Sequence, residues 1–311
     1  MISIAPPANS KEAAREEAVR LSQPPLLQEL KRLKFRARRK ISTDLAGGFR
    51  TAFRGSGLQF RELRQYEPGD EIRSIQWKAS ARTGTTYVKT YEEERQLRFH
   101  VVVDSSRSTI GSLHGSGREQ IAEFATLIAL LARLNNDAIA LTLVSNTIEL
   151  SIPSACRRNH IDRIIAELLA PRELRPKTDL AVALSALNAR ERRRSIIFLI
   201  SDLFTSPFRD ELKLLSRRHD VVVVHAAPPL EAEVPSAGLL LVTDAETGTS
   251  RTIDTSSRAG RELYHQALLK RRTELSTMVS DAGADFIEIG ESPFGALQAL
   301  IRQRSRQRGL A

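Results

Sequence analysis

The chain has 311 residues, of which 41% are apolar and 27% are charged, so it can bury a hydrophobic core in one large domain or two modest ones. Its net charge of +10 at pH 7 permits nucleic acid, an acidic protein or anionic lipid as a partner. The only cysteine, Cys156, excludes a disulfide framework and any multi-cysteine zinc or iron–sulfur site.

The longest apolar runs, Ile196–Ile200 and Val221–Val224, are too short to cross a bilayer, and no apolar signal core precedes Lys11. A single cysteine also suits a reducing compartment. We therefore expect a cytoplasmic protein that does not span a membrane.

Residues 1–46 are predicted to form an N-terminal helical segment. Apolar residues recur at helical spacing from Leu26 to Ala37, and seven of the ten residues from Lys31 to Lys40 are basic. This basic run is either a solvated helix face or a binding surface for an ATPase or a nucleic acid. Nucleic acid is the weaker alternative, because Phe35 is the only aromatic side chain in the run that could stack on a base.

A small β-rich module is predicted over residues 47–97, where glycines recur and short alternating stretches lie between them. The stretches Gln59–Tyr66 and Thr86–Tyr91 are typical of half-buried antiparallel strands. Pro68 and Gly69 suit the centre of a type II turn, because glycine accepts a positive φ without steric cost.

From residue 98 to residue 311 the pattern predicts one α/β domain. Phe99–Val103 is a continuous β-branched run, as in strands that are buried on both faces of a parallel sheet. Helical patterns alternate with further strands, which predicts a doubly wound, mostly parallel sheet. The other predicted strands lie near Ala138–Val144, Thr147–Ile152, Ile196–Ser201, Val221–His225 and Asp285–Ile289. A hairpin is predicted to join Leu239–Val242 to Arg251–Ile253.

Polar side chains at the ends of two predicted strands indicate a binding site. Asp104, Ser106 and Ser108 follow the first strand in an Asp-x-Ser-x-Ser pattern, and Asp202 follows a later strand. Thr178 opens a predicted helix and can reach the same edge of the sheet, where ligands of open α/β sheets bind. Two carboxylates and three hydroxyls suit Mg²⁺, or another hard cation such as Ca²⁺ or Mn²⁺, and not zinc.

Each of these residues also has an ordinary structural explanation. Thr178 is a typical helix N-cap, and Asp202 could be a strand-end turn residue. If Asp104 and Asp202 lie about 4 Å apart, their charges repel by roughly 4 kcal/mol at an effective dielectric constant of about 20. The site then needs a cation or a proton, and Arg107 or Lys177 is the alternative to a metal ion.

A second informative stretch runs from Tyr66 to Thr83 and holds the only tryptophan, Trp77. Together with Arg73, Lys78 and Arg82, it forms either an anion- or partner-binding surface or a structural element in which a buried Trp77 anchors the module. We favour the structural interpretation and keep these four residues as candidates for partner binding.

These stretches together resemble domain-of-unknown-function family fifty-eight. The resemblance is carried by Gly47–Gly57, Tyr66–Thr83, Tyr87–Lys89, Glu92–Arg95 and Asp104–Ser108. It is specific up to Ser108 and continues more loosely to the end of the chain. Two positions depart from the family pattern. Gln76 replaces the usual aspartate of an Ile-Asp-Trp motif, and Thr109 replaces the usual methionine, which we expect to affect packing more than ligation.

The resemblance implies a von Willebrand factor A-like domain, with a metal-ion-dependent adhesion site on Asp104, Ser106, Ser108, Thr178 and Asp202. It also implies an association with MoxR-type AAA+ ATPases, beside which such proteins are commonly encoded. The sequence itself has no G-x-x-x-x-G-K-[ST] loop, so we do not expect it to hydrolyse nucleotides.

We therefore predict a non-enzymatic, metal-dependent adaptor that binds an acidic residue of a client protein. By resemblance, it would work with a MoxR-type ATPase in the assembly or maturation of a protein complex. One alternative is a metal-dependent phosphoester hydrolase, for which Lys177 is the obvious candidate lysine. The other is a nucleic-acid-associated factor that uses the basic N-terminal helix.

Overall fold

The computed structural model describes residues 24–53, 58–93, 96–106, 109, 116–170, 179–205, 207–226, 236, 238–243, 250–290 and 292–307. The chain divides into two compact units, Met1–Ala52 with Arg98–Ala311, and Phe53–Leu97. The N-terminal helices therefore belong with the α/β domain, whereas we expected a separate segment over residues 1–46.

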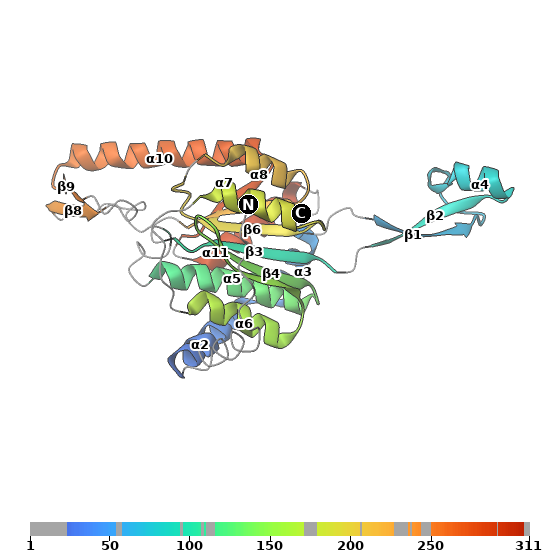
Figure 1. Ribbon diagram of the computed structural model, residues 1–311, viewed down its shortest axis with the longest axis horizontal. Helices are drawn as coiled ribbons and strands as arrows, with labels where there is room; N and C mark the ends of the chain where they lie inside the picture. Colours follow the sequence, from blue (N-terminus) through green and yellow to red (C-terminus); the bar gives the residue numbers. More distant parts are fainter. Residues whose placement is uncertain are drawn as a thin grey trace, which may run out of the picture. The chain divides into compact units, whose positions relative to one another are not determined.

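A six-stranded sheet lies at the centre of the first unit, with the strand order β10-β7-β6-β3-β4-β5 (Figure 1). Its strands are β3 (Arg98–Asp104), β4 (Ala138–Val144), β5 (Ile148–Ala155), β6 (Ile196–Ser201), β7 (Asp220–His225) and β10 (Asp285–Glu288). Every neighbouring pair is parallel except β4 and β5. In chain order this is the 3-2-1-4-5-6 arrangement of doubly wound folds, with an antiparallel strand at one edge. The predicted fold class is confirmed.

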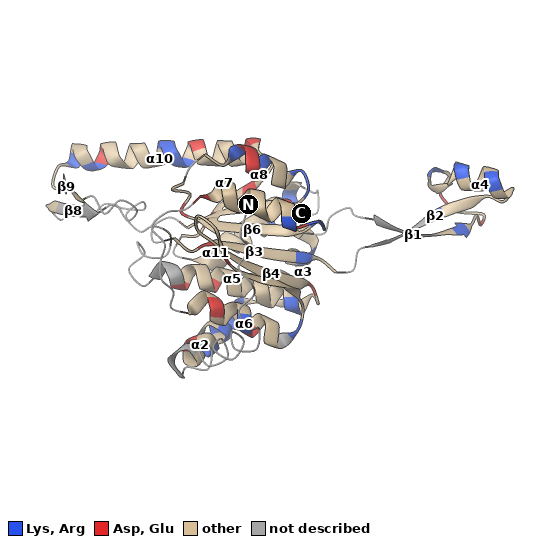
Figure 2. Cartoon of the chain, in the orientation of Figure 1, with Lys and Arg blue, Asp and Glu red and all other residues tan. Residues whose placement is uncertain are grey.

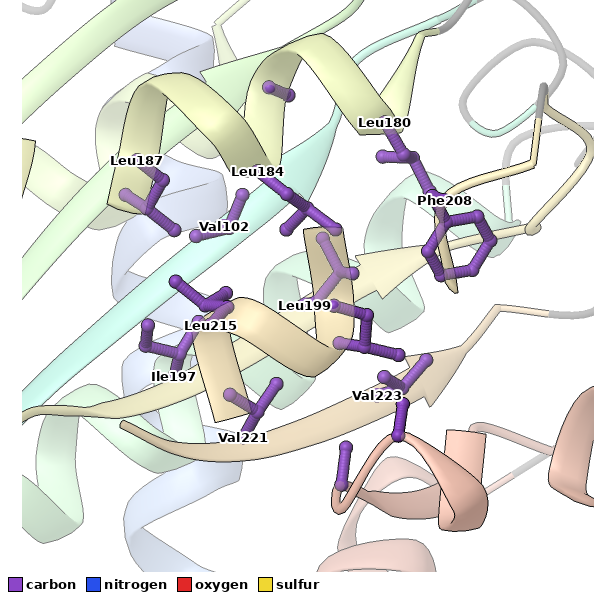
Figure 3. Close-up of a cluster of buried hydrophobic side chains, with 14 of the residues drawn as sticks. Val102, Leu180, Leu184, Leu187, Ile197, Leu199, Phe208, Leu215, Val221 and Val223 are labelled. Carbon is purple, nitrogen blue, oxygen red and sulfur yellow. The ribbon is translucent and has the colours of Figure 1, made fainter. Parts of the chain in front are cut away.

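Helices cover both faces of this sheet (Figure 1). They are α2 (Pro24–Lys40), α3 (Thr43–Phe53), α5 (Ser116–Leu134), α6 (Arg158–Leu169), α7 (Leu180–Arg190), α8 (Arg209–Ser216), α10 (Arg258–Asp281) and α11 (Pro293–Gln307). Helices α5 and α6 contact each other on one face, and α7 and α8 contact each other on the other face. Figure 3 shows Leu184, Leu187 and Leu215 of this second pair packed with Ile197 and Val221 of the sheet. Because both faces are covered, β4 and β6 are buried at every position.

The basic helix α2 packs against α5 and α6. Its apolar residues Leu30, Leu33 and Ala37 are buried. Three of its less exposed basic side chains form close ion pairs: Lys34 with Asp162, Arg36 with Glu119 (2.6 Å) and Lys40 with Glu123 (2.6 Å). This part of the basic run is therefore not the solvated face that we expected, because α5 and α6 supply partner carboxylates. The other basic side chains of the run are exposed, namely Lys31, Arg32, Arg38 and Arg39. The exposed Arg32 lies 4.0 Å from Glu119.

Helix α3 corrects the predicted start of the β-rich module at residue 47. Leu45, Phe49 and Ala52 are buried at helical spacing. Phe49 also stacks on Phe99 of β3, with ring centroids 5.1 Å apart. The core of the α/β domain therefore stabilises a helix where the recurring glycines suggested loops.

Gly48 lies where α3 and α11 come close together. A Cβ atom at this position would lie 3.3 Å from Cγ2 of Ile301, whereas a Cβ at Gly47 would meet nothing within 4 Å. Gly48 thus permits close helix packing and does not mark a turn.

The second unit contains the two antiparallel strands that were predicted. Its elements are β1 (Leu58–Gln65), the 3-10 helix η1 (Ile72–Ser74), α4 (Trp77–Thr83) and β2 (Tyr87–Glu93). The Ser80 hydroxyl ties α4 to β2, because it accepts a hydrogen bond from Tyr87 N at 2.9 Å. Asp70 accepts hydrogen bonds from Glu67 N at 2.9 Å and from Arg64 Nη2 at 2.5 Å, and these bonds lower the pKa of its carboxyl group.

A further antiparallel pair, β8 (Leu239–Thr243) with β9 (Ser250–Asp254), agrees with the predicted hairpin. Helix α10 follows it and begins after Ser257, whose hydroxyl accepts a hydrogen bond from Gly260 N at 3.2 Å. Among the described helices, none combines the length and the apolar character that a membrane span requires.

Candidate metal centre at the edge of the sheet

Two buried aspartates lie where the strand order of the sheet reverses. Strands β3 and β6 are parallel neighbours, with Val103 opposite Ile200, so their carboxyl ends lie at the same edge. Asp104 ends β3 and Asp202 follows β6, and the two residues are 0% and 1% exposed. This edge is the switch point at which doubly wound sheets bind ligands.

Hydrogen bonds from its own loop and from β6 hold the Asp104 carboxylate. Ser106 N donates to Oδ1 at 3.0 Å, and the Ser201 hydroxyl donates to Oδ2 at 2.8 Å. Buried carboxylates are costly unless such partners orient and stabilise them. Asp104 is therefore fixed in position by its own loop and by the neighbouring strand.

The Thr109 hydroxyl joins the two aspartate loops. It accepts hydrogen bonds from the Ser106 hydroxyl at 3.3 Å and from Asp202 N at 3.4 Å. Asp202 Oδ1 in turn accepts a hydrogen bond from Phe204 N at 3.0 Å. The structure thus brings Asp104, Ser106 and Asp202 into one network, and it adds a hydroxyl that we expected to affect mainly packing. The sequence signal for this hydroxyl was the polar Thr109 at a position where the family usually has methionine.

The N-terminus of α7 reaches the same edge through Asp179. The Asp179 amide donates to Ser145 O at 3.1 Å, and Leu180 N donates to Thr205 Oγ1 at 3.2 Å. Asp179 also caps the helix, because its Oδ1 accepts a hydrogen bond from Val182 N at 3.1 Å.

The N-cap function that we considered for Thr178 therefore belongs to Asp179. Thr178 itself and Ser108 lie outside the described residues, as do Arg107 and Lys177, the two cationic alternatives to a metal ion.

The donors that the structure brings together fit a hard divalent cation. Carboxylate and hydroxyl oxygens are the ligands that Mg²⁺ and Ca²⁺ prefer, and Mg²⁺ often keeps several waters. Two buried carboxylates at one edge also favour a bound cation, because burial weakens the screening of their charges. Within the described part of the chain, no group of three or more His, Cys, Asp or Glu side chains could hold a metal ion, at this edge or elsewhere.

The candidate partner-binding residues lie on the second unit and are exposed. Trp77 is 66% exposed, so our interpretation of it as a buried anchor is wrong. Helix α4 turns Ala79 and Ser80 toward the module and leaves Trp77, Lys78 and Arg82 in solvent. A seven-residue helix covers the hairpin with only one side, so the tryptophan is left outside.

Basic residues are close to this exposed tryptophan in the sequence. Figure 2 shows that lysine and arginine gather on α4. Within the described part of the chain, Arg73, Lys78 and Arg82 form no ion pair, and Ile72, which precedes Arg73 in the sequence, is 69% exposed. We call Ile72, Arg73, Trp77, Lys78 and Arg82 the α4 face. It combines cations with exposed apolar groups, as protein-binding surfaces do.

His100 and His225 lie in strands of the sheet and are buried in its core. His100 Nε2 lies 2.7 Å from Thr142 Oγ1, and its Nδ1 lies 3.6 Å from Glu191 Oε1. Burial lowers the pKa of His100 to about 4, with smaller contributions from Arg190 and His219. His100 lies near the start of β3 and Asp104 at its end, so this histidine is not part of the candidate metal centre.

The fold and the site define a doubly wound α/β domain with a carboxylate- and hydroxyl-rich centre at its switch point. The chain belongs to the family described as protein of unknown function DUF58, whose model matches residues 62–274. A relative, the uncharacterized protein Rv1480 of Mycobacterium tuberculosis H37Rv, is 27% identical over 276 residues, which cover 86% of each chain.

Two solved structures are similar in fold. An aerotolerance-related membrane protein from Bacteroides fragilis aligns with a TM-score of 0.45 and 14% identity, over 68% of this chain and 99% of that one. The SpRpn10 VWA domain aligns with a TM-score of 0.37 and 11% identity, over 67% of this chain and 95% of that one. The strand order, and not these low TM-scores, defines the fold.

Proposed function

We propose that this protein is a non-enzymatic, metal-dependent binding protein. Asp104, Ser106, Ser108, Thr178 and Asp202 would hold Mg²⁺, or Ca²⁺ or Mn²⁺ in its place, and an acidic side chain of a client protein would complete the coordination. The observation that carries the proposal is the hydrogen-bonded network that links two buried aspartates at the switch point. A bound divalent cation would compensate both carboxylates and leave a position for a third.

The residues around the site prepare it for such binding. Ser201 and the Ser106 amide orient Asp104, and the Phe204 amide orients Asp202. Groups of this kind raise metal affinity because they reduce the freedom that ligands lose on binding. Because β3 and β6 are parallel neighbours, the two loops that carry the candidate ligands begin close to each other.

The α4 face would provide a second contact. Its three cations favour an acidic protein surface, and its exposed Trp77 and Ile72 supply apolar area for the centre of an interface. From the resemblance, the partner that we propose is a MoxR-type AAA+ ATPase, and the process is assembly or maturation of a protein complex.

A nucleic-acid-binding function has less support. Lys34, Arg36 and Lys40 pair with carboxylates of α5 and α6, so they cannot at the same time neutralise phosphates. A phosphoester hydrolase would need a lysine at the metal site, and its candidate Lys177 lies outside the described residues.

The first experiment measures Mg²⁺ binding by isothermal titration calorimetry for the wild type, Asp104→Ala and Asp202→Asn. Asp281→Ala is the matched control, because Asp281 is exposed and forms a surface ion pair with Arg209 at 3.3 Å. We expect binding in the wild type and the control, and none in the two site variants. Equal binding in Asp104→Ala and the wild type would contradict the proposed metal site.

The second experiment follows partner binding. Trp77 is the only tryptophan, so its fluorescence reports directly on the α4 face. Addition of a purified MoxR-type AAA+ ATPase should change the emission of the wild type and not of Lys78→Glu/Arg82→Glu. Chelation of Mg²⁺ should release an acidic client but leave the α4 contact intact.

Hydrolysis of p-nitrophenyl phosphate that depends on Mg²⁺ and Asp104 would favour the hydrolase instead.

A further inference from the structure

Helix α10 reaches the candidate metal centre through the side chain of Arg271. Its Nη2 donates a hydrogen bond to Leu203 O at 3.2 Å. Its guanidinium carbon lies 3.2 Å from the centroid of the Phe204 ring, which is a cation–π contact. Leu203 and Phe204 directly follow Asp202, so Arg271 holds the loop that carries a candidate ligand.

This loop has an uncommon backbone conformation. Leu203 is buried and has a φ of 57°, in the left-handed region that non-glycine residues seldom adopt. Such a conformation persists only where the surrounding contacts determine it, and it is common at binding sites. Here the Leu203 amide donates to Ser201 Oγ at 2.9 Å, and its carbonyl accepts the bond from Arg271. Hydrogen bonds therefore fix both the amide and the carbonyl group of Leu203.

The same contacts continue to both aspartates. The Ser201 hydroxyl that accepts from Leu203 also donates to Asp104 Oδ2 at 2.8 Å. On the other side, Phe204 N donates to Asp202 Oδ1 at 3.0 Å while its ring stacks under the guanidinium. A change in the Arg271 contacts would thus alter the groups that orient each carboxylate.

We infer that Arg271 is a positioning residue for the metal centre. It fixes the backbone from Asp202 to Phe204 so that the carboxylates of Asp104 and Asp202 keep the geometry for a shared cation. Since Arg271 belongs to α10, movement of this helix changes cation affinity at the sheet edge. This inference rests on the proposed metal-binding function and goes beyond it by assigning control of the site to a helix outside the ligand loops.

The test compares four variants with the wild-type chain. Arg271→Ala removes both contacts, Arg271→Lys keeps the charge but not the planar stack, and Phe204→Leu removes only the ring. Lys270→Ala is the control, because it removes one positive charge from the same helix at a side chain that is 79% exposed. Mg²⁺ dissociation constants are measured by calorimetry. Hydrogen–deuterium exchange of the peptide around residues 201–205 is measured without metal.

We expect the Mg²⁺ dissociation constant of Arg271→Ala to rise about tenfold or more, as is typical when the support of metal ligands is lost. Arg271→Lys and Phe204→Leu should give smaller increases, and Lys270→Ala less than about a twofold change. The loop amides should exchange faster in Arg271→Ala than in Lys270→Ala, even without metal. A general loss of fold stability would not by itself produce this graded order of Mg²⁺ dissociation constants.

Three results would overturn the inference. The first is an unchanged dissociation constant in Arg271→Ala, with the wild type binding Mg²⁺ normally, which leaves the proposed function intact. The second is tighter binding in Arg271→Ala, which would make Arg271 a competing cation. The third is a wild-type protein that binds no Mg²⁺, which removes the proposed function and this inference together.

Discussion

Replacement of Arg304 should cost more stability than any ordinary surface substitution. Its side chain, on α11, is 7% exposed. It donates to Asp220 Oδ1 and Oδ2 at 2.6 and 2.9 Å and to Asp285 Oδ2 at 2.6 Å. The two aspartates open β7 and β10, so this one guanidinium joins the last helix to two neighbouring strands.

The expected magnitude follows from what Arg304→Ala leaves behind. The side chains of Asp220 and Asp285 are only 21% and 23% exposed, and both would lose their cation. Removal of one partner from a buried ion pair costs about 3–5 kcal/mol. The melting temperature should then fall by roughly 10 °C, at about 2–4 °C per kcal/mol for a domain of this size.

Urea denaturation followed by circular dichroism measures this loss. The control is Arg209→Ala, because Arg209 and Asp281 form an exposed pair whose contribution should stay below about 1 kcal/mol. The Arg304 effect should also persist at high salt, since buried pairs are little screened. A loss in Arg304→Ala no larger than that in Arg209→Ala would refute this reasoning.

Three further predictions concern other parts of the α/β domain. The folded protein keeps His100 neutral down to about pH 4, whereas the unfolded chain takes up this proton near pH 6.5. The unfolding free energy should therefore fall by about 3 kcal/mol between pH 6.5 and pH 4. Urea titrations of His100→Asn at several pH values should lack this contribution to the dependence of unfolding free energy on pH. The same pH dependence in His100→Asn and the wild type would contradict the prediction. Ser201→Ala removes a hydrogen bond to a buried carboxylate and should cost about 1.5–3 kcal/mol by urea denaturation, and a loss below 0.5 kcal/mol would argue against it. Gly47→Ala should raise the unfolding free energy by about 0.5–1 kcal/mol, because a side chain there meets nothing within 4 Å. Gly48→Leu should lower it by about 1–3 kcal/mol, because its side chain would press on Ile301 of α11. Thermal melts that rank the two variants in the opposite order would contradict close packing of α3 on α11 at Gly48.

Much of the candidate site could be predicted because its residues follow strands. Asp104 and Asp202 stand at or just beyond the ends of apolar strands, and parallel strands bring their carboxyl ends to one edge. Thr109 was expected to affect mainly packing and Ser201 was not singled out, since a hydroxyl becomes part of a site only through the atoms that the fold places beside it. Asp179 was missed as the helix cap because Thr178 beside it is an equally suitable cap by residue type.

The amino-acid sequence alone determined the elements whose signal is local: the buried strands of the sheet, the β1–β2 pair and the acidic and hydroxyl pattern after β3. Only the tertiary structure decided that residues 47–53 are helical, that the basic residues of α2 face carboxylates and that Trp77 is exposed. The physical reason is the range of the interactions. A strand buried on both faces is apolar along its whole length, which a reader of the sequence can see. Burial of Phe49, the ion pair of Lys40 and the exposure of Trp77 depend on surfaces that distant segments supply, or do not supply, after folding.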